Sequence, residues 1–208
     1  MKPEKLFMSK IQKIREDFDG GCADKLQEFK GNSGLSDEER FNELCFCILV
    51  AGSNLEQTKK AWQENKNNFQ TLGYKELRKK LKESGCRFNH RASYIVEARE
   101  TIKNINFNEK DHFTLREQLV KNIKGLGMKE ASHFLRNLGY ENFAILDTHV
   151  LKTLKENGMI KEIPKTLTKN KYLEIEKVLE KLAGKLNISQ AELDLYLFYF
   201  DSKKIPKK

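Results

Sequence analysis

Residues 121–135 read KNIKGLGMKEASHFL, and this stretch predicts two helices joined by a very short turn. An amphipathic pattern occupies its first part, and a second helical pattern begins near Met128, so only four residues connect the two. Gly125 and Gly127 flank Leu126, which predicts a tight turn with positive φ at the glycines and the leucine buried between the helices.

Such a turn leaves the amide hydrogens of Gly127, Met128 and Lys129 facing outward at the start of the second helix. Amides without a partner at a helix N-terminus attract a phosphate oxygen. The pattern is therefore typical of a helix-hairpin-helix motif that holds the backbone of DNA, here about residues 113–138. An ordinary αα-hairpin without a ligand has the same Gly-x-Gly spacing and is the alternative.

A second signal lies 18 residues after Lys129, where Asp147 opens another helix within the sequence ILDTHVL. A lysine amine is a nucleophile and a carboxylate is a suitable partner for it, so a fold that brings Lys129 and Asp147 together forms a candidate active site. Taken singly, each residue has a simpler interpretation: Lys129 as a solvated side chain, and Asp147 as a helix N-cap. Their presence in one chain favours the catalytic interpretation.

Helical periodicity dominates the rest of the chain and predicts an all-α protein. The first helix carries an apolar stripe over 6–18 and is expected to end at Gly20-Gly21. Residues 36–39 have the form of a capping box, and the apolar run after them predicts a central helix. Further helices are expected near 54–66, 74–84, 90–104, 112–123, 129–138, 148–157, 169–186 and 189–201.

Strands are scarce. The best candidate, FAIL at 143–146, leads directly into Asp147 and is interpreted as a buried connection. A βαβ enzyme would need several β-branched runs that alternate with helices, and the sequence lacks them. No Gly/Ser-rich or Pro-rich linker separates the halves, so any second lobe must share elements with the first.

The composition of the 208 residues narrows the class of protein. Lys and Arg number 39 against 30 Asp and Glu, a net charge of +9 that favours a polyanionic partner, either nucleic acid or an acidic membrane surface. No apolar run approaches the roughly 18 residues that span a bilayer, and no signal-peptide core is present, so we expect an intracellular protein of the cytoplasm or nucleoid. The four cysteines match no zinc or iron–sulfur spacing, so no metal is expected. Cys45 and Cys47 lie in an apolar stretch and are expected to be buried thiols; a redox pair at these two residues is the alternative.

The stretches 123–137 and 144–151 resemble the helix-hairpin-helix DNA glycosylase superfamily, and within it the compact archaeal-type 8-oxoguanine DNA glycosylase/AP lyases. Iron–sulfur relatives such as endonuclease III carry four closely spaced cysteines after the catalytic segment, whereas no cysteine follows Cys86 here. The similarity extends over essentially the whole chain, with further matches in ELCFCIL at 43–49, RF at 87–88, RASYIV at 91–96, EIPK at 162–165 and DLYL at 194–197.

The resemblance implies a single glycosylase unit over residues 1–208, with two interleaved helical lobes and an active-site cleft between them. It implies that Lys129 attacks C1′ of the deoxyribose and that Asp147 assists departure of the base. The amine then forms a Schiff base with the sugar, and β-elimination nicks the strand on the 3′ side. This chemistry requires no metal or organic cofactor.

An enzyme that acts on a base inside a duplex must flip that base out of the stack. Arg87, Phe88 and Asn89 are the predicted wedge, because one loop presents a cation, a ring and an amide together. The alternative places Phe88 in the core and Arg87 at the surface. Phe198 and the C-terminal Lys208 are the residues expected near the flipped base.

The sequence therefore predicts a bifunctional 8-oxoguanine DNA glycosylase/AP lyase that acts as a monomer on double-stranded DNA containing oxidised guanine, without a membrane. The segment AGSNLE at 51–56 and Phe198 depart from the residues common in the family, and both are expected near the base pocket. These departures permit one alternative, a glycosylase for another damaged base. The other alternative is a non-catalytic DNA-binding module that uses the hairpin only as a phosphate clamp.

Overall fold

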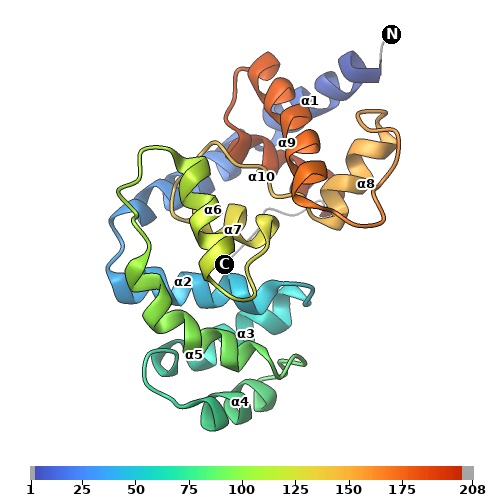
Figure 1. Cartoon of the computed structure of the whole chain (residues 1–208). Coiled ribbons are helices and arrows are strands. Elements are labelled where there is room, and N and C mark those ends of the chain that lie inside the picture. Colours follow the sequence, from blue (N-terminus) through green and yellow to red (C-terminus); the bar gives the residue numbers. More distant parts are fainter. Residues whose placement is uncertain (1–2, 203–208) are drawn as a thin grey trace. The chain divides into compact units, whose positions relative to one another are not determined.

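The structure is a computed structural model that describes residues 3–202, without the side chains of residues 18–20, 201 and 202. Over these residues the chain is helical and contains no strand (Figure 1), as the sequence predicts. Short 3₁₀ helices occupy Asn32–Gly34, Lys66–Asn68 and Ile102–Asn104. The α-helices are α1 (Pro3–Gly31), α2 (Asp37–Val50), α3 (Leu55–Asn65), α4 (Tyr74–Glu83), α5 (Arg91–Thr101), α6 (His112–Asn122), α7 (Met128–Asn137), α8 (Thr148–Glu156), α9 (Lys169–Leu186) and α10 (Gln190–Ser202).

The chain forms two compact units. One is continuous and comprises Gly34–Phe134, whereas the other joins Met1–Ser33 to Leu135–Lys208. The boundary between Phe134 and Leu135 falls inside α7. The polypeptide therefore leaves the discontinuous unit after α1 and re-enters it through α7.

In the continuous unit, α2 supplies the core and packs against α3 and α5. Its apolar run is almost completely buried, from Phe41 to Leu49. Both bonds of the predicted capping box are present: the Ser36 hydroxyl accepts from the Glu39 amide, and the Glu39 carboxylate accepts from the Ser36 amide at 2.9 Å. Trp62 of α3 packs edge-on against Phe46 of α2. Local capping and apolar burial thus fix α2 at the centre of this unit.

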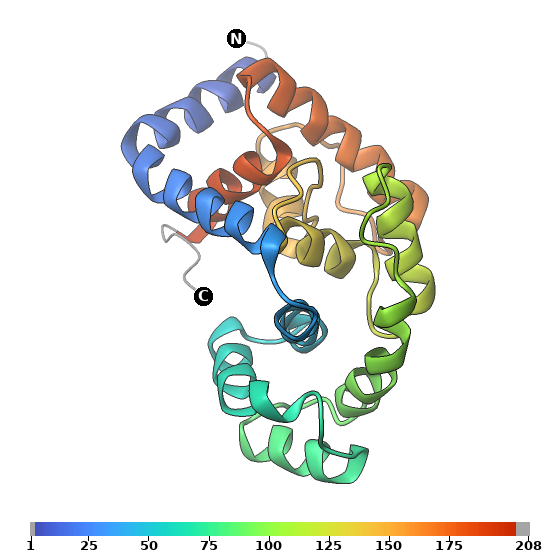
Figure 2. The same cartoon turned by 90° about the vertical axis from the view of Figure 1, so that its left-hand side faces the viewer.

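In the discontinuous unit, α10 packs against α1, α8 and α9 (Figure 2). The prediction that the first helix ends at Gly20-Gly21 is wrong, because α1 continues to Gly31. Each glycine inside a helix costs about 1 kcal/mol relative to alanine. Side chains on both sides of the pair are buried, among them Ile11 before it and Phe29 after it, and their packing offsets that cost.

The segment 143–146 is a buried connection without regular structure, as predicted. Its backbone polar groups bond to side chains of α9 instead of to another strand. The Tyr172 hydroxyl donates to the Ala144 carbonyl at 2.6 Å and accepts from the Leu146 amide at 3.4 Å. The Glu176 carboxylate accepts from the Ala144 amide at 3.3 Å. Because buried backbone groups must be paired, α9 holds this segment in place, and the segment leads into Asp147.

Cys45 and Cys47 are buried thiols, as predicted. Cys22 is also buried, Cys86 is half-buried, and none of these four cysteines forms a disulfide. Burial raises the pKa of the Cys45 thiol well above its ordinary value, which opposes thiolate formation there. Among residues 3–202, no group of His, Cys, Asp and Glu side chains is arranged to hold a metal ion. No described helix is both long enough and apolar enough to cross a membrane.

Candidate active site

The predicted hairpin is formed by α6 and α7, with residues 123–127 between them. Leu126 is buried between the exposed Gly125 and Gly127, which confirms its predicted place in the interior of the turn. Gly125 has φ +87°, and a Cβ atom added to it would lie 2.5 Å from Cδ2 of Tyr94. Both the backbone conformation and the close approach of the tyrosine ring therefore require glycine at this position.

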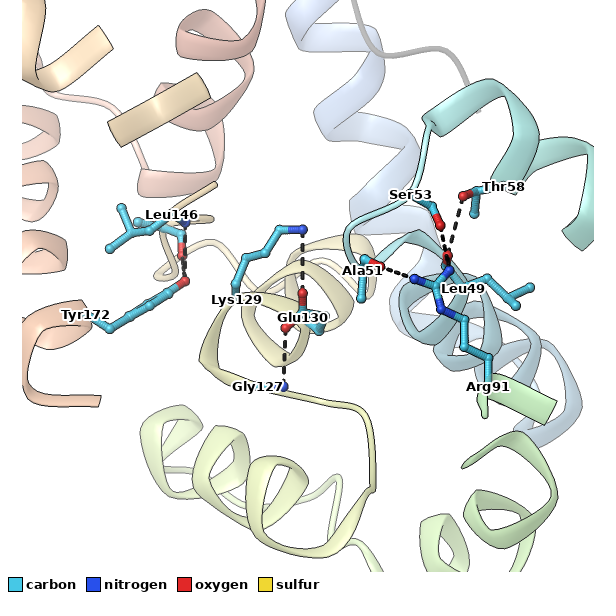
Figure 3. A network of polar contacts seen from close by, with 11 residues as sticks. Leu49, Ala51, Ser53, Thr58, Arg91, Gly127, Lys129, Glu130, Leu146 and Tyr172 are labelled. Atoms are coloured by element: carbon cyan, nitrogen blue, oxygen red, sulfur yellow. Dashed lines mark hydrogen bonds and ion pairs between the residues drawn. The ribbon is translucent and has the colours of Figure 1, made fainter. Parts of the chain in front are cut away.

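Gly127 differs from the prediction, because its φ is not positive. Its amide donates a hydrogen bond to Oε2 of Glu130 at 3.2 Å (Figure 3). Its carbonyl accepts from the Ala131 amide at 3.0 Å, which makes Gly127 the N-cap of α7. Glu130 stands three residues later, where an acidic side chain reaches back to the N-cap amide. One of the three amides predicted to bind phosphate is thus already bonded to a carboxylate of the same helix.

Lys129 lies in the first turn of α7, and its Nζ is 3.5 Å from Oε1 of Glu130. Only 25 % of its side chain is exposed, so it is not the fully solvated lysine of the simpler interpretation. A buried bond braces the helix beneath it: Arg116 of α6 donates to the Ser132 hydroxyl of α7 at 3.0 Å. The amine is therefore carried by a braced helix and held on one side by a carboxylate.

Asp147 is the N-cap of α8, and its Oδ1 accepts from the Val150 amide at 2.8 Å. The predicted capping role is present, and the cap fixes the carboxylate at a given position. The residue before Asp147 is held by α9, because the Leu146 amide donates to the Tyr172 hydroxyl (Figure 3). Lys129 belongs to the continuous unit and Asp147 to the discontinuous one. Each residue is well supported within its own unit, and their pairing stays a prediction.

Arg87, Phe88 and Asn89 are all exposed in the loop between α4 and α5. Phe88 keeps 37 % of its surface accessible, so the alternative that buries its ring in the core is wrong. An aromatic side chain exposed to this extent at the tip of a loop is available for stacking on a base. The wedge role itself stays a prediction.

The segment 51–56, whose residues differ from those common in the family, lies beside this loop. It connects α2 to α3, and the Asn54 side chain caps α3 by accepting from the Glu56 amide at 3.0 Å. A pocket of about 350 Å³ lies between the segment and the wedge loop. Its lining includes Gly52, Ser53, Asn54, Arg87, Phe88 and Arg91.

Of the two residues predicted near the base, only Phe198 lies among the described residues. Phe198 is half-buried on α10, whereas Leu193, Tyr196 and Leu197 of the same helix are buried, as their helical spacing predicts. Lys208 lies outside the described residues. Their contacts with a base stay predictions.

Sequence reasoning missed two residues. Glu130 had a local signal, because an acidic residue three positions after an N-cap glycine is half of a capping box. Arg91, a buried arginine with partners 38 to 42 residues away, had no local signal. Only the folded chain brings those partners to it.

An all-helical chain with a Gly-Leu-Gly hairpin and a lysine in the next turn defines a helix-hairpin-helix protein. A family model described as 8-oxoguanine DNA glycosylase matches residues 22–188. An 8-oxoguanine DNA glycosylase/AP lyase of Methanocaldococcus jannaschii is 46% identical over 206 residues, which cover 97% of this chain and 100% of the relative. The chain therefore belongs to the 8-oxoguanine DNA glycosylase/AP lyase family.

Solved structures agree with this assignment. The Methanocaldococcus jannaschii 8-oxoguanine glycosylase/lyase, crystallised with a 15mer DNA containing 8-oxoguanine, matches with a TM-score of 0.93 and 44% identity over 97% of this chain and 100% of that one. The 8-oxoguanine DNA glycosylase of Thermotoga maritima matches with a TM-score of 0.91 and 40% identity over 98% of this chain and 100% of that one. The predicted family and the predicted all-α fold are both confirmed.

Proposed function

We propose that this protein, an 8-oxoguanine DNA glycosylase/AP lyase that acts in DNA repair, uses Lys129 as the nucleophile for both of its reactions. The observation that carries this proposal is the place of the amine: Lys129 comes two residues after the last glycine of the Gly-Leu-Gly turn, in the first turn of a braced helix, with Nζ 3.5 Å from Oε1 of Glu130. A solvated lysine needs none of this support. A lysine amine held in one place is suited to covalent attack on a sugar carbon.

In the first reaction, the neutral Lys129 amine attacks C1′ of the flipped nucleotide. The bond between C1′ and the base breaks, and its electron pair leaves with the base, which takes up a proton. The covalent amine then loses a proton, and the sugar ring opens to give a Schiff base at C1′. Loss of a proton from C2′ expels the 3′ phosphate, which nicks the strand on the 3′ side. Every proton and electron pair in this sequence is exchanged with substrate, solvent or side chains, so no cofactor is needed.

Asp147 is the carboxylate partner in this proposal. Its negative charge stabilises the positive charge that develops on the sugar as the base departs. The cap to the Val150 amide at 2.8 Å uses the same carboxylate and holds it at a fixed position. The proposal requires Asp147 and Lys129 to act on the same nucleotide.

The hairpin is the proposed phosphate clamp, formed by the backbone at Gly125, Gly127 and Met128. The net charge of +9 supports binding to the DNA backbone. Because Glu130 accepts from the Gly127 amide at 3.2 Å, that amide contacts a phosphate only after the carboxylate has released it. The Gly127 contact is thus made only in the complex.

Arg87, Phe88 and Asn89 form the proposed wedge, which fills the gap left by the flipped nucleotide. Phe198 and Lys208 are the proposed contacts to the base. The substrate is double-stranded DNA with an oxidised guanine, and the protein is proposed to work as a monomer in the compartment that holds the cell's DNA.

The experiment that tests the nucleophile is borohydride trapping, which reduces the Schiff base to a stable protein–DNA adduct. Three duplexes are compared, one with a single 8-oxoguanine, one with a single abasic site and one undamaged. We expect an adduct with the first two and none with the third. Lys129→Gln should abolish both adducts while its affinity for the duplex stays within several-fold of the wild type.

Lys103→Gln is the matched control, because Lys103 also pairs with a glutamate, at 2.7 Å, and is an exposed lysine of the same unit. It should trap like the wild type. An adduct formed by Lys129→Gln would refute the role of Lys129 as the nucleophile. An adduct with the abasic duplex alone would point to another damaged base, and loss of trapping together with loss of binding would mean that Lys129 serves binding.

A further inference from the structure

Arg91, the first residue of α5, is a buried cation that ties two loops together. Only 4 % of its surface is accessible. Its guanidinium donates to the carbonyls of Leu49 and Ala51 at the end of α2, and to the Ser53 hydroxyl at 2.7 Å (Figure 3). The last carbonyls of a helix lack partners within it and carry partial negative charge, so an arginine satisfies them well.

The same guanidinium contacts the predicted wedge. The Cζ atom of Arg91 lies 4.2 Å from the centroid of the Phe88 ring, which is a cation–π contact. The ring of His90 lies 5.8 Å from that of Phe88 on the same loop. One guanidinium thus bonds to the end of α2 and lies over an exposed aromatic ring.

This arrangement bears on how the wedge works. An exposed phenylalanine on a loop has several rotamers available, and ordering it on DNA costs conformational entropy. A ring that already rests on a fixed guanidinium has lost much of that freedom before DNA binds. The cation itself is fixed by three acceptors, two carbonyls at the end of α2 and the Ser53 hydroxyl in the α2–α3 connection.

We propose that Arg91 is the positioning residue of the wedge: it holds Phe88 in the orientation in which the ring enters the duplex. This inference rests on the wedge role assigned to Phe88 under the proposed function. It also assigns a role to the segment 51–56, because Ala51 and Ser53 accept hydrogen bonds from the arginine that supports the ring.

A double-mutant cycle tests the inference, with single-turnover excision of 8-oxoguanine measured under excess enzyme. The variants are Arg91→Lys, Phe88→Ala and the double variant, and the substrates are a duplex and the same lesion strand without its complement. We expect Arg91→Lys to slow duplex excision about tenfold. It should cause no further loss in the Phe88→Ala background, and it should leave excision from the single strand unchanged, since that strand has no partner to be separated from.

Arg99→Lys is the matched control. Arg99 of the same helix also donates to two backbone carbonyls, those of Phe69 and Leu72, both at 2.6 Å, and it lies away from the wedge loop in sequence. Its loss should lower thermal stability to a similar degree, while the ratio of duplex to single-strand excision stays at the wild-type value. This comparison separates a positioning role from a general loss of stability.

Ser53→Ala is the second, milder variant, because it removes one anchor of the guanidinium and leaves the contact with Phe88. It should slow duplex excision less than Arg91→Lys, and again only when Phe88 is present. Equal losses with and without Phe88, or equal losses on both substrates, would overturn the inference. If Phe88→Ala alone excises from duplex at the wild-type rate, the wedge role fails and the inference fails with it, whereas trapping through Lys129 is unaffected.

Discussion

Glu130 joins the proposed phosphate clamp to the proposed nucleophile. Its Oε2 accepts from the Gly127 amide at 3.2 Å, and its Oε1 lies 3.5 Å from Nζ of Lys129. The same carboxylate caps α7 and pairs with the amine, and its side chain is only 14 % exposed. Both proposed functions of the hairpin therefore meet at one side chain.

Substitution of Glu130 should separate these two contacts. Glu130→Ala removes the cap and the ion pair and should lower the free energy of unfolding by about 1 kcal/mol. Glu130→Gln keeps an oxygen that accepts from the Gly127 amide, so its free energy of unfolding should fall clearly less. Urea unfolding of both variants measures the difference. Equal losses would mean that the ion pair, and not the cap, supplies the stability.

Asp147→Asn should retain the fold and lose activity. Asparagine is as good an N-cap as aspartate, so the bond to the Val150 amide is kept and the unfolding midpoint should change little. Excision of 8-oxoguanine should slow by a factor of about 100 or more, because the negative charge is lost. Asp111→Asn is the matched control, since Asp111 caps α6 by accepting from the Phe113 amide. Near-normal excision by Asp147→Asn would remove this carboxylate from the mechanism.

The two hairpin glycines should respond differently to alanine. Gly125→Ala forces a side chain onto a backbone with φ +87° and places its Cβ 2.5 Å from the Tyr94 ring, so a loss of about 2 kcal/mol or more is expected. Gly127→Ala meets only the flexible Glu130 carboxylate, at 3.2 Å, and should cost less than about 1 kcal/mol. Thermal unfolding of the two variants measures both losses of stability. A larger loss for Gly127→Ala than for Gly125→Ala would contradict the turn geometry.

The capping box of α2 should make stability depend on pH. Hydrogen bonds from the Ser36 hydroxyl and then the Ser36 amide hold the pKa of the Glu39 carboxyl below its ordinary value of 4.5. The unfolded chain therefore binds more protons in this range, so the contribution is complete above the unfolded pKa and is lost as the pH falls through the folded pKa. Ser36→Ala should flatten this acid limb. Unfolding measured from pH 7 down to about 3 tests it, and identical slopes would contradict the prediction.

Local patterns were sufficient for most of the fold. The apolar spacing predicts each helix from α2 to α10. In a helix with one buried face, apolar residues recur about every 3.6 positions, whatever the helix packs against. The capping box at Ser36 and the tight turn around Leu126 were also predictable, because their hydrogen bonds and steric limits involve residues only a few positions apart. The prediction was wrong at Gly20-Gly21, where packing overrides the low helix propensity of glycine.

The sequence by itself determined the helices from α2 to α10, the hairpin and the candidates for the catalytic residues, through short-range rules of periodicity, capping and backbone freedom. The tertiary structure alone decided that the guanidinium of Arg91, which contacts the Phe88 ring, is anchored to the end of α2. The guanidinium of Arg91 satisfies carbonyls about 40 residues away in the chain, and no periodicity encodes such a contact. Long-range polar contacts depend on which buried groups the packed helices leave without partners, and packing is settled only when the whole chain has folded.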